Sequence, residues 1–323
     1  MHETPRDAPE FPRGESRSVH HPNTMGINAL LICIVIGGTL FQLFGLPFVL
    51  RLWGIHAACL LLPIALLQPL HWGLIHEAIH SHLLTDRRTE EFVARLLSVM
   101  HWLPYDATRY CHLVHHQFSR HAYDRADEYD GRGSYAVAWV RYRLWLCGGL
   151  YWAILFSPVV AFLPERYRAR VMANAVPLRE EGDSKIRRLF VSLAMNTAKR
   201  RRTCREFVLT VVLYGASVWV YGEWWPMLLA AMSARGLWHS IADNLAHHDV
   251  ALDEPERARN HAVPRWFGIL LLNQHLHLTH HRWPRVPWKL LPKLIDSGET
   301  GQPENYFRAA LRQFEHRYPR LAA

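Results

Sequence analysis

The chain has 323 residues and a formal net charge of +9, and half of its residues are hydrophobic while only 20% are charged. This mixture, with a mean hydropathy of -0.08, is typical of a membrane protein with large polar parts, although the length alone would allow one to three soluble domains. The five Cys residues form no C-x-x-C pair, which argues against an iron-sulfur cluster and a disulfide framework.

The N-terminal part of the sequence predicts a tail followed by a membrane hairpin. Residues 1–24 are polar and rich in Pro, Arg and Glu, so we expect a disordered cytoplasmic tail. The apolar run at about 27–50 is too long for a signal peptide and predicts a membrane span. After an R-L-W-G turn at 51–54, a second run predicts a return span at about 52–75.

The middle of the sequence contains a third apolar run at 144–163, interrupted by Gly148, Gly149 and Pro158. The segment that follows, 165–205, carries a strong excess of Arg and Lys, and such segments stay on the cytoplasmic side. We therefore expect the run to be a shallow or re-entrant element. The basic segment predicts a surface beside anionic lipid rather than a nucleic-acid partner.

A second hairpin is predicted from two shorter arms, at about 207–222 and 225–243, joined by a Y-G-E-W-W-P turn that suits a membrane interface. The expected fold is therefore an all-α integral membrane protein with about four transmembrane helices in two hairpins. Residues 25–323 would form a single domain. Its cytoplasmic helical cap would comprise residues 76–206 and 244–323, because each hairpin returns the chain to the cytoplasmic side.

Two separate stretches of the predicted cap read His-x-x-His-His, which is more than composition predicts. Their histidines are His112, His115, His116, His277, His280 and His281. Residues three and four apart share a helix face, so each stretch could aim three imidazoles at one point. Imidazole nitrogen is a preferred ligand of iron, copper and zinc, so the two stretches predict one shared metal site.

A third motif follows the second predicted span. His76, Glu77 and His80 spell H-E-x-x-H, the helical zinc motif in which Glu is the general base of a metalloprotease. Such a protease needs only one further ligand, and this would leave both His-x-x-His-His stretches unexplained. The sequence therefore favours His76 and His80 as ligands of the shared site.

A fourth contribution comes from D-N-L-A-H-H-D at the end of the last predicted span. Asn244 and His248 are four residues apart, so His248 could ligate while the Asn244 amide holds a metal-bound water; His247 is the rival ligand. Nearby carboxylates could accept the second ring N–H of a ligating His, although a plain surface carboxylate is the better single explanation for each. These carboxylates are Glu77, Asp127, Glu128, Asp243 and Asp249.

Together these motifs resemble the integral-membrane fatty acid desaturase and hydroxylase family. The likeness rests on HEAIH at 76–80, HLVHH at 112–116, the Asn244 and His248 pair, HLTHH at 277–281 and the stretch HHRWPRVPW at 280–288. It spans roughly residues 27–295. It implies a mushroom-shaped fold of four membrane helices, a cytoplasmic cap and two irons bound by His. Glu77 departs from the Asp of many relatives, which leaves the subfamily open.

The ligand chemistry points the same way. Nine candidate His are too many for one metal and about right for two, and nitrogen-rich ligation suits redox-active iron. The predicted ligands are His76, His80, His112, His115, His116, His248, His277, His280 and His281. We therefore expect a non-haem di-iron site that uses O2 to remove hydrogen from an acyl or other lipid chain.

Other possibilities stay open at this point. A hydroxylase or carotenoid ketolase of the same family would need the same residues, and a metal transporter would also be rich in His, although transport sites lie near the bilayer midplane. The sequence contains no haem, flavin or Cys-cluster motif, so the electrons must come from another protein, for which the resemblance implies a ferredoxin or a small haem protein. The remaining nearby histidines are expected to pack or hydrogen-bond: His71, His82, His101, His121, His239 and His275.

Overall fold

The structure is a computed structural model that describes residues 22–129, 131, 133–252, 257–295 and 303–315. Helices dominate this part of the chain, and its only β-pairing consists of two isolated bridges, Asn260 with Leu276 and Ala262 with Asn305. The all-helical prediction is therefore confirmed for the described residues. Residues 1–21 of the predicted tail (1–24) lie outside the described residues, and the first helix begins at Pro22, before the predicted end of the tail.

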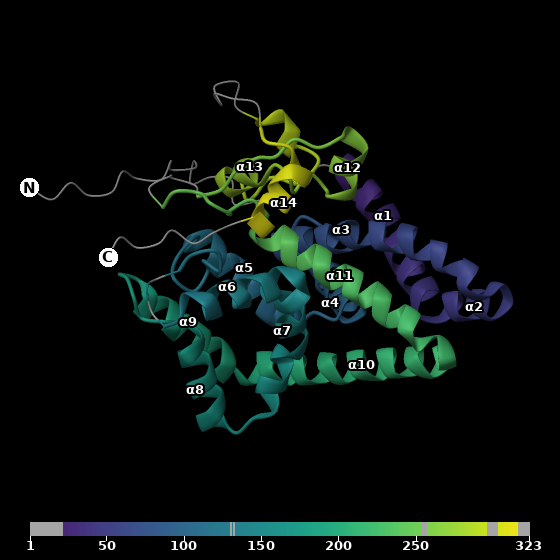
Figure 1. The fold of residues 1–323 in the computed structure, drawn as a ribbon, viewed down its shortest axis with the longest axis horizontal. Coiled ribbons are helices and arrows are strands. Elements are labelled where there is room, and N and C mark those ends of the chain that lie inside the picture. The colour runs from purple at the N-terminus through teal and green to yellow at the C-terminus, as the bar shows by residue number, and fades with distance from the viewer. Residues whose placement is uncertain (1–21, 130, 132, 253–256, 296–302, 316–323) are drawn as a thin grey trace, which may run out of the picture.

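The first hairpin is one long helical run that folds back on itself (Figure 1). Helix α1 (Pro22–Leu40) continues through a π-helical turn (Phe41–Gly45) into α2 (Leu46–Trp53), and a 3-10 segment (Gly54–Leu60) leads to α3 (Leu61–Ile79). The chain reverses at Gly54, whose φ of 58° is readily adopted only without a Cβ. This position lies within the predicted R-L-W-G turn. Helix α3 packs against α1 and extends past residue 75, so it carries the H-E-x-x-H motif.

The second hairpin consists of α10 (Thr197–Tyr221) and α11 (Trp225–Leu245), joined at Gly222 with φ 56°. Asn196 caps α10 by accepting a hydrogen bond from the Lys199 N–H at 2.9 Å. The helix begins ten residues before the predicted arm. The prediction missed these residues because they are rich in Lys and Arg, and a hydropathy scan detects only apolar runs. The 25 and 21 residues of the two helices correspond to roughly 37 and 31 Å, enough to cross a bilayer core of about 30 Å.

The third apolar run is helical from its start and kinked in the middle. The predicted run at 144–163 forms a π-helical turn (Trp145–Gly149), α7 (Leu150–Phe156) and a 3-10 segment (Ser157–Phe162), and α6 (Tyr135–Leu144) leads into it without a break. The kink falls at Gly148, with φ 104°, where the run packs closely against α11. Length and composition make the run a candidate membrane span, so a re-entrant course stays a prediction.

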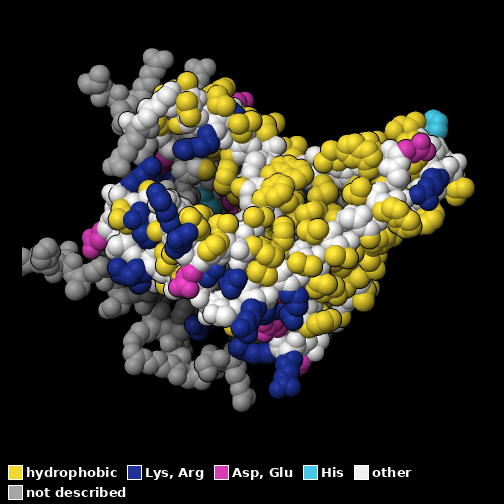
Figure 2. Space-filling model, turned by 90° about the horizontal axis from the view of Figure 1, so that it is seen from below, with side chains coloured by type: hydrophobic (Ala, Val, Ile, Leu, Met, Phe, Trp, Pro, Cys, Tyr) yellow, Lys and Arg dark blue, Asp and Glu magenta, His cyan; other side chains and the backbone are white. Residues whose placement is uncertain are grey.

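Within the described ranges, three helical segments are long and apolar enough to cross a membrane: Thr24–Ile79, Tyr135–Phe162 and Thr197–Leu245. Many of their large apolar side chains are exposed, for example Leu62 at 67% and Trp219 at 83%. Figure 2 shows hydrophobic side chains over the narrow arm of the molecule, while Lys and Arg gather over its broader part. This distribution fits an apolar membrane portion joined to a polar cap.

The remaining helices gather at one end of the hairpins (Figure 1). They are α4 (Arg87–His101), α5 (Tyr105–Gln117), α8 (Glu165–Ala175), α9 (Asp183–Met195), α12 (Arg265–Leu270), α13 (His277–Arg282) and α14 (Tyr306–Glu315). Their position at the C-terminal ends of α3 and α11 brings distant parts of the sequence together at the end of the membrane arms.

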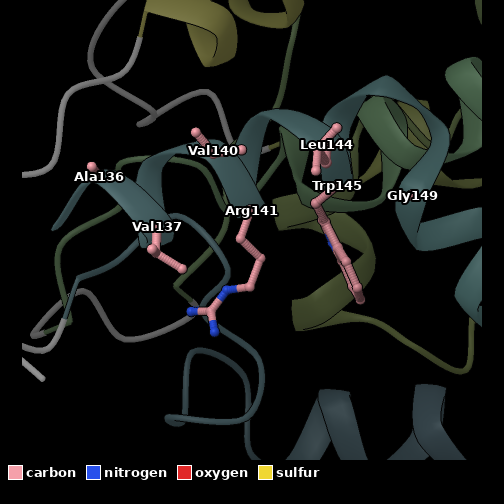
Figure 3. Close-up of a pocket in the computed structure, with 7 residues that line it drawn as sticks. All are labelled: Ala136, Val137, Val140, Arg141, Leu144, Trp145 and Gly149. Atoms are coloured by element: carbon pink, nitrogen blue, oxygen red, sulfur yellow. The ribbon is translucent and has the colours of Figure 1, made fainter. Parts of the chain in front are cut away.

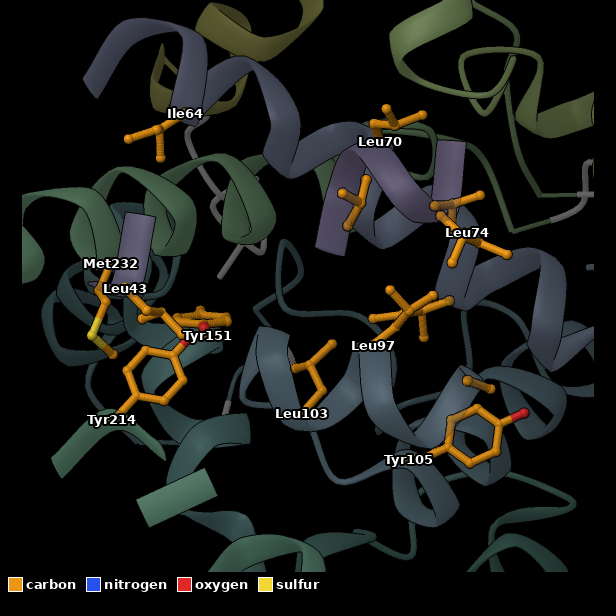
Figure 4. Close-up of a cluster of buried hydrophobic side chains, with 14 of the residues drawn as sticks. Leu43, Ile64, Leu70, Leu74, Leu97, Leu103, Tyr105, Tyr151, Tyr214 and Met232 are labelled. Carbon is orange, nitrogen blue, oxygen red and sulfur yellow. The ribbon is translucent and has the colours of Figure 1, made fainter. Parts of the chain in front are cut away.

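The main hydrophobic cluster joins both hairpins to α4 and α7 (Figure 4). Leu74 of α3, Leu97 of α4 and Tyr151 of α7 are among its fully buried members. Since apolar burial contributes about 25 cal/mol per Å² removed from water, such a cluster fixes the relative positions of these helices. The C-terminal ends of α3 and α11 are thereby held in place.

The guanidinium of Arg235 is fully buried within this core. Arg235 of α11 donates hydrogen bonds to Gln68 Oε1 of α3 at 2.6 Å and to Tyr214 Oη of α10 at 2.7 Å. The Tyr214 hydroxyl in turn donates to the Met100 carbonyl at 2.7 Å, in the last turn of α4. The guanidinium therefore links both hairpins to the negative end of the α4 dipole, where a cation is favoured.

Candidate metal centre

Among the described residues, nine histidines gather in two groups in which the candidate ligand nitrogens of each group all lie within 4.8 Å of one another. The first group contains His76, His80, His112, His116 and His280, and the second contains His115, His247, His277 and His281. The groups are adjacent, since the rings of His116 and His281 stack with centroids 4.4 Å apart. Imidazoles from four distant segments therefore meet in one place.

The helices explain how each group receives its members. His76 lies in the last turn of α3, and His80 is the residue that ends this helix. Helix α5 presents His112 and His116 to the first group and His115 to the second, while α13 presents His280 to the first and His277 and His281 to the second.

Each His-x-x-His-His stretch is therefore split between the two groups, and does not aim three imidazoles at one point as the spacing suggested. The reason is helical geometry. At 3.6 residues per turn, His112 and His116 are only about 40° apart around the axis, whereas His115 is about 100° from His116. The i and i+4 positions of α5 share one target, while the i+3 position, about 60° from i and 100° from i+4, faces the second group.

The contacts within the first group are too many for hydrogen bonding between neutral imidazoles. His112 Nε2 lies 2.9 Å from His80 Nε2 and 3.0 Å from His116 Nε2, and His116 Nε2 is also 3.0 Å from His280 Nε2. A ring nitrogen is either a donor or an acceptor, so the middle members cannot satisfy two such neighbours well. A shared cation can, because bonds of about 2.1 Å place neighbouring ligand nitrogens of a six-coordinate site roughly 3.0 Å apart.

His76 gives a second indication of a cation. Its ring is buried, and neither of its nitrogens has a hydrogen-bond partner within the part of the chain that the structure describes. Leaving a buried polar atom unsatisfied costs about 1–3 kcal/mol, so such atoms usually mark a missing ion, water or ligand.

In the second group, outer hydrogen bonds orient the rings. His115 Nδ1 donates to Asp124 Oδ2 at 2.7 Å, and His247 Nδ1 donates to the Arg257 carbonyl at 2.7 Å. Both bonds place the proton on Nδ1 and leave the Nε2 lone pairs facing each other, 3.1 Å apart. This is the arrangement by which proteins fix the tautomer of metal-ligating His.

Burial sets the protonation of these rings. It lowers the pKa of His80 to about 3, of His116 to about 2 and of His247 to about 3, with further lowering by neighbouring histidines. These imidazoles are neutral at pH 7, as ligation requires.

The pKa of His115 shifts in the opposite direction from those of the other rings. Burial acts to lower its pKa, but the charge of Asp124 and the hydrogen bond to it outweigh burial and leave the pKa raised. The same contact, against the effect of burial, keeps the pKa of Asp124 below its usual value. A permanently charged carboxylate at Nδ1 makes the ring more basic and Nε2 a stronger ligand.

Eight of the nine predicted ligands lie in the two groups, and the ninth position differs. His247, rather than His248, contributes its nitrogen to the second group. The i to i+4 argument that linked His248 to Asn244 assumed a continuous helix, but α11 ends at Leu245 and the following residues form a turn.

The predicted supporting residues have different surroundings. The Asn244 amide nitrogen lies 3.4 Å from Tyr142 Oη and 3.5 Å from Gln313 Oε1, so its role in holding water stays a prediction. The Glu77 carboxylate is buried, accepts a hydrogen bond from the Trp288 N–H at 3.2 Å and comes within 3.9 Å of His76 Nδ1. Asp243 is close enough for its charge to help raise the pKa of His115.

The sequence did not identify Asp124 as the partner of His115. The only sequence signal for Asp124 was that it is the first carboxylate after the HLVHH motif at 112–116. Of the carboxylates named instead, Asp127 and Glu128 pair with Arg120 at 2.6 and 2.9 Å, and Asp249 has an exposed side chain.

Comparison with models of known protein families matches most of the chain to one of them. Residues 51–297, about three quarters of the chain, match the family model described as fatty acid desaturase, and this range contains all nine clustered histidines. Neither the curated proteins nor the solved structures include a match.

Proposed function

The chain belongs to the fatty acid desaturase family, and from this premise we propose that it is a membrane-bound di-iron oxidoreductase that uses O2 to desaturate a fatty acyl or other lipid chain. The observation that carries the proposal is the pair of adjacent groups, five and four imidazoles, at the end of the membrane arms. When bound there, two irons would supply the strong oxidant that no side chain provides.

The chain's own residues would bind and orient this centre. The neutral rings offer Nε2 lone pairs, and Asp124 and the Arg257 carbonyl hold two of the rings in the required tautomer. His76, His247 and His280 are each at most 4% exposed, and the other six histidines of the two groups are partly buried. Their burial supports a site that limits access of bulk water, which strengthens electrostatic interactions and protects a reactive centre.

The surroundings of α6 support a lipid substrate. A groove of about 590 Å³ runs along α6 and the π-helical turn after it, lined by Val137, Val140, Leu144 and Trp145 among others. Figure 3 shows Val137, Arg141 and Trp145 pointing to the same side of the helix. On its buried side, α6 presents Tyr142 to Asn244, one turn before His247. An acyl chain could therefore lie beside the helix that borders the centre.

The domain arrangement and orientation are part of the same proposal. We infer a single membrane domain with four crossings, whose cap and histidine centre face the cytoplasm. The support is the excess of Arg and Lys in residues 165–205, since such segments are retained on that side. The same basic surface would suit an acidic electron donor such as a ferredoxin or small haem protein.

The position of Glu77 argues against the metalloprotease alternative. Its carboxylate is buried and already accepts the Trp288 N–H, and His82 Nδ1 lies 4.0 Å from it. A general base must instead reach a metal-bound water and a peptide substrate. A transporter is disfavoured because the histidines lie at the ends of the α3 and α11 arms, away from their middle.

The reaction can be tested by expressing the chain in a lipid-producing host and purifying it from membranes. We expect two irons per chain and a lipid product lighter than its substrate by two hydrogens. Gain of one oxygen would instead identify the hydroxylase alternative, and gain of one oxygen with loss of two hydrogens would identify the ketolase alternative. One zinc and no iron per chain, with unchanged lipids, would contradict the proposal.

A second prediction concerns Asp124. Replacing it with Asn removes the charge that holds His115, so we expect iron affinity to fall at least about tenfold, as for other partners of metal-bound His. Competition with an iron chelator measures this change. Asp249→Asn is the control, because that side chain is exposed; equal iron affinity in the two variants would contradict the role of Asp124.

A further inference from the structure

A third cluster of potential ligands lies in the cap, apart from the nine histidines. His121, in the loop after α5, faces Glu180 and Asp183 at the start of α9. His121 Nδ1 is 3.5 Å from Glu180 Oε1 and 3.5 Å from Asp183 Oδ1, and the three atoms all lie within 4.8 Å of one another. The sequence predicted only packing or hydrogen bonding for His121.

Hydrogen bonds do not account for the buried atoms of this cluster. The Asp183 side chain is 1% exposed, and its Oδ2 accepts the N–H groups of Arg179 and Glu180 at 2.7 and 2.9 Å. Asp183 Oδ1 and His121 Nδ1 are buried, and among the described residues neither has a hydrogen-bond partner. Two unsatisfied polar atoms facing each other are costly and indicate a ligand between them.

The distances distinguish this cluster from a short, hydrogen-bonded ion pair. In the same chain, His115 and Asp124 form a hydrogen-bonded pair at 2.7 Å, the usual length for charged partners. Two separations of 3.5 Å are too long for such a bond. They match a shared tetrahedral cation, because bonds of about 2.1 Å to nitrogen and oxygen place neighbouring ligand atoms roughly 3.4 Å apart.

The surroundings leave room for the imidazole and provide charge for a cation. Gly182 has φ 97°, and a Cβ there would come within 3.2 Å of His121 Cε1, so glycine permits the close approach of the ring. One imidazole and two carboxylates suit Zn²⁺. Glu180 Oε1 also accepts the Ala122 N–H at 2.7 Å and lies 3.4 Å from Arg125, which offsets part of the negative charge.

We propose that His121, Glu180 and Asp183 form a separate divalent-cation site, best suited to Zn²⁺, that ties the loop after α5 to the start of α9. A water would complete the coordination sphere. The site has a structural consequence for the histidine centre, because the Asp124 N–H donates to the His121 carbonyl at 2.7 Å. The cation would therefore steady the loop from which Asp124 holds His115.

Zinc binding to the full-length protein in detergent tests the site, with the histidine centre first saturated with iron. We expect wild type to bind one more Zn²⁺ per chain than His121→Ala, and Glu180→Gln to weaken this binding at least about tenfold. Glu181→Gln is the matched control, since it removes an adjacent exposed carboxylate outside the cluster. It should bind zinc as wild type does.

A second measurement separates the site from the histidine centre. His112→Ala should retain the extra Zn²⁺, because His112 belongs to the other cluster, and the difference between wild type and Glu180→Gln should persist even if the chain takes up no iron. Equal zinc binding by wild type, His121→Ala and Glu180→Gln would overturn the proposal.

Discussion

His112→Ala is expected to abolish product formation and to cost the protein at least one of its irons. His112 Nε2 is in contact with the Nε2 atoms of both His80 and His116, so it occupies the middle of the five-imidazole group. Loss of an outer partner of a metal-bound His already lowers affinity or activity 10–100-fold, and loss of a ligand should exceed this. Iron content by elemental analysis and product by mass spectrometry measure the effect.

The control for this prediction is His56→Ala. His56 is exposed in the 3-10 segment where the first hairpin reverses, at the opposite end of α3 from the histidine groups. Helix α5 should survive the His112 substitution because Ala has the highest helix propensity. Unchanged iron content and activity in His112→Ala would remove the basis for the proposed centre.

Among the variants proposed here, Arg235→Met is expected to lower the free energy of unfolding the most. The substitution keeps an apolar stem of similar length but leaves Gln68, Tyr214 and the other polar partners without their donor in the core. Each unsatisfied buried group costs about 1–3 kcal/mol, so the free energy of unfolding should fall by roughly 3 kcal/mol or more. For a chain of this size we expect the thermal midpoint to fall by about 5 °C or more, measured in detergent.

Arg141→Met is the matched control for this change. Arg141 lies on the exposed side of α6, and removal of a solvated surface charge usually changes stability by less than about 0.5 kcal/mol. If the two variants unfolded at the same temperature, the Arg235 network would not be a source of stability.

The sequence predicted the hairpins well where apolar runs end in glycine turns. Gly54 falls within the predicted turn, and Gly222 lies in the Y-G-E-W-W-P turn, because both positions need a φ that other residues avoid. The start of α10 was missed because its first turns are basic, and hydropathy measures polarity rather than helicity. The course of the kinked segment around Gly148 depends on packing against α11, which no local pattern records.

The candidate site was also largely predictable, since helix spacing identified eight of the nine clustered histidines. The difference at His247 arose from the end of α11 at Leu245, which changes the direction of the side chains that follow. Asp124 could not be found from spacing. It reaches His115 only because the loop folds back at Arg120, whose φ is 62° and whose N–H donates to Asp124 Oδ2.

Helices α5 and α13 each supply imidazoles to both groups, so the gap between the groups is fixed by the pitch of a single helical turn. Changes in bilayer thickness or curvature that tilt α3 and α11 would move His76, His80 and His247, whereas the histidines of α5 and of α13 would keep their spacing within each helix. Lipid composition would therefore alter how a substrate arrives, while the spacing that α5 and α13 set between the two groups would stay constant.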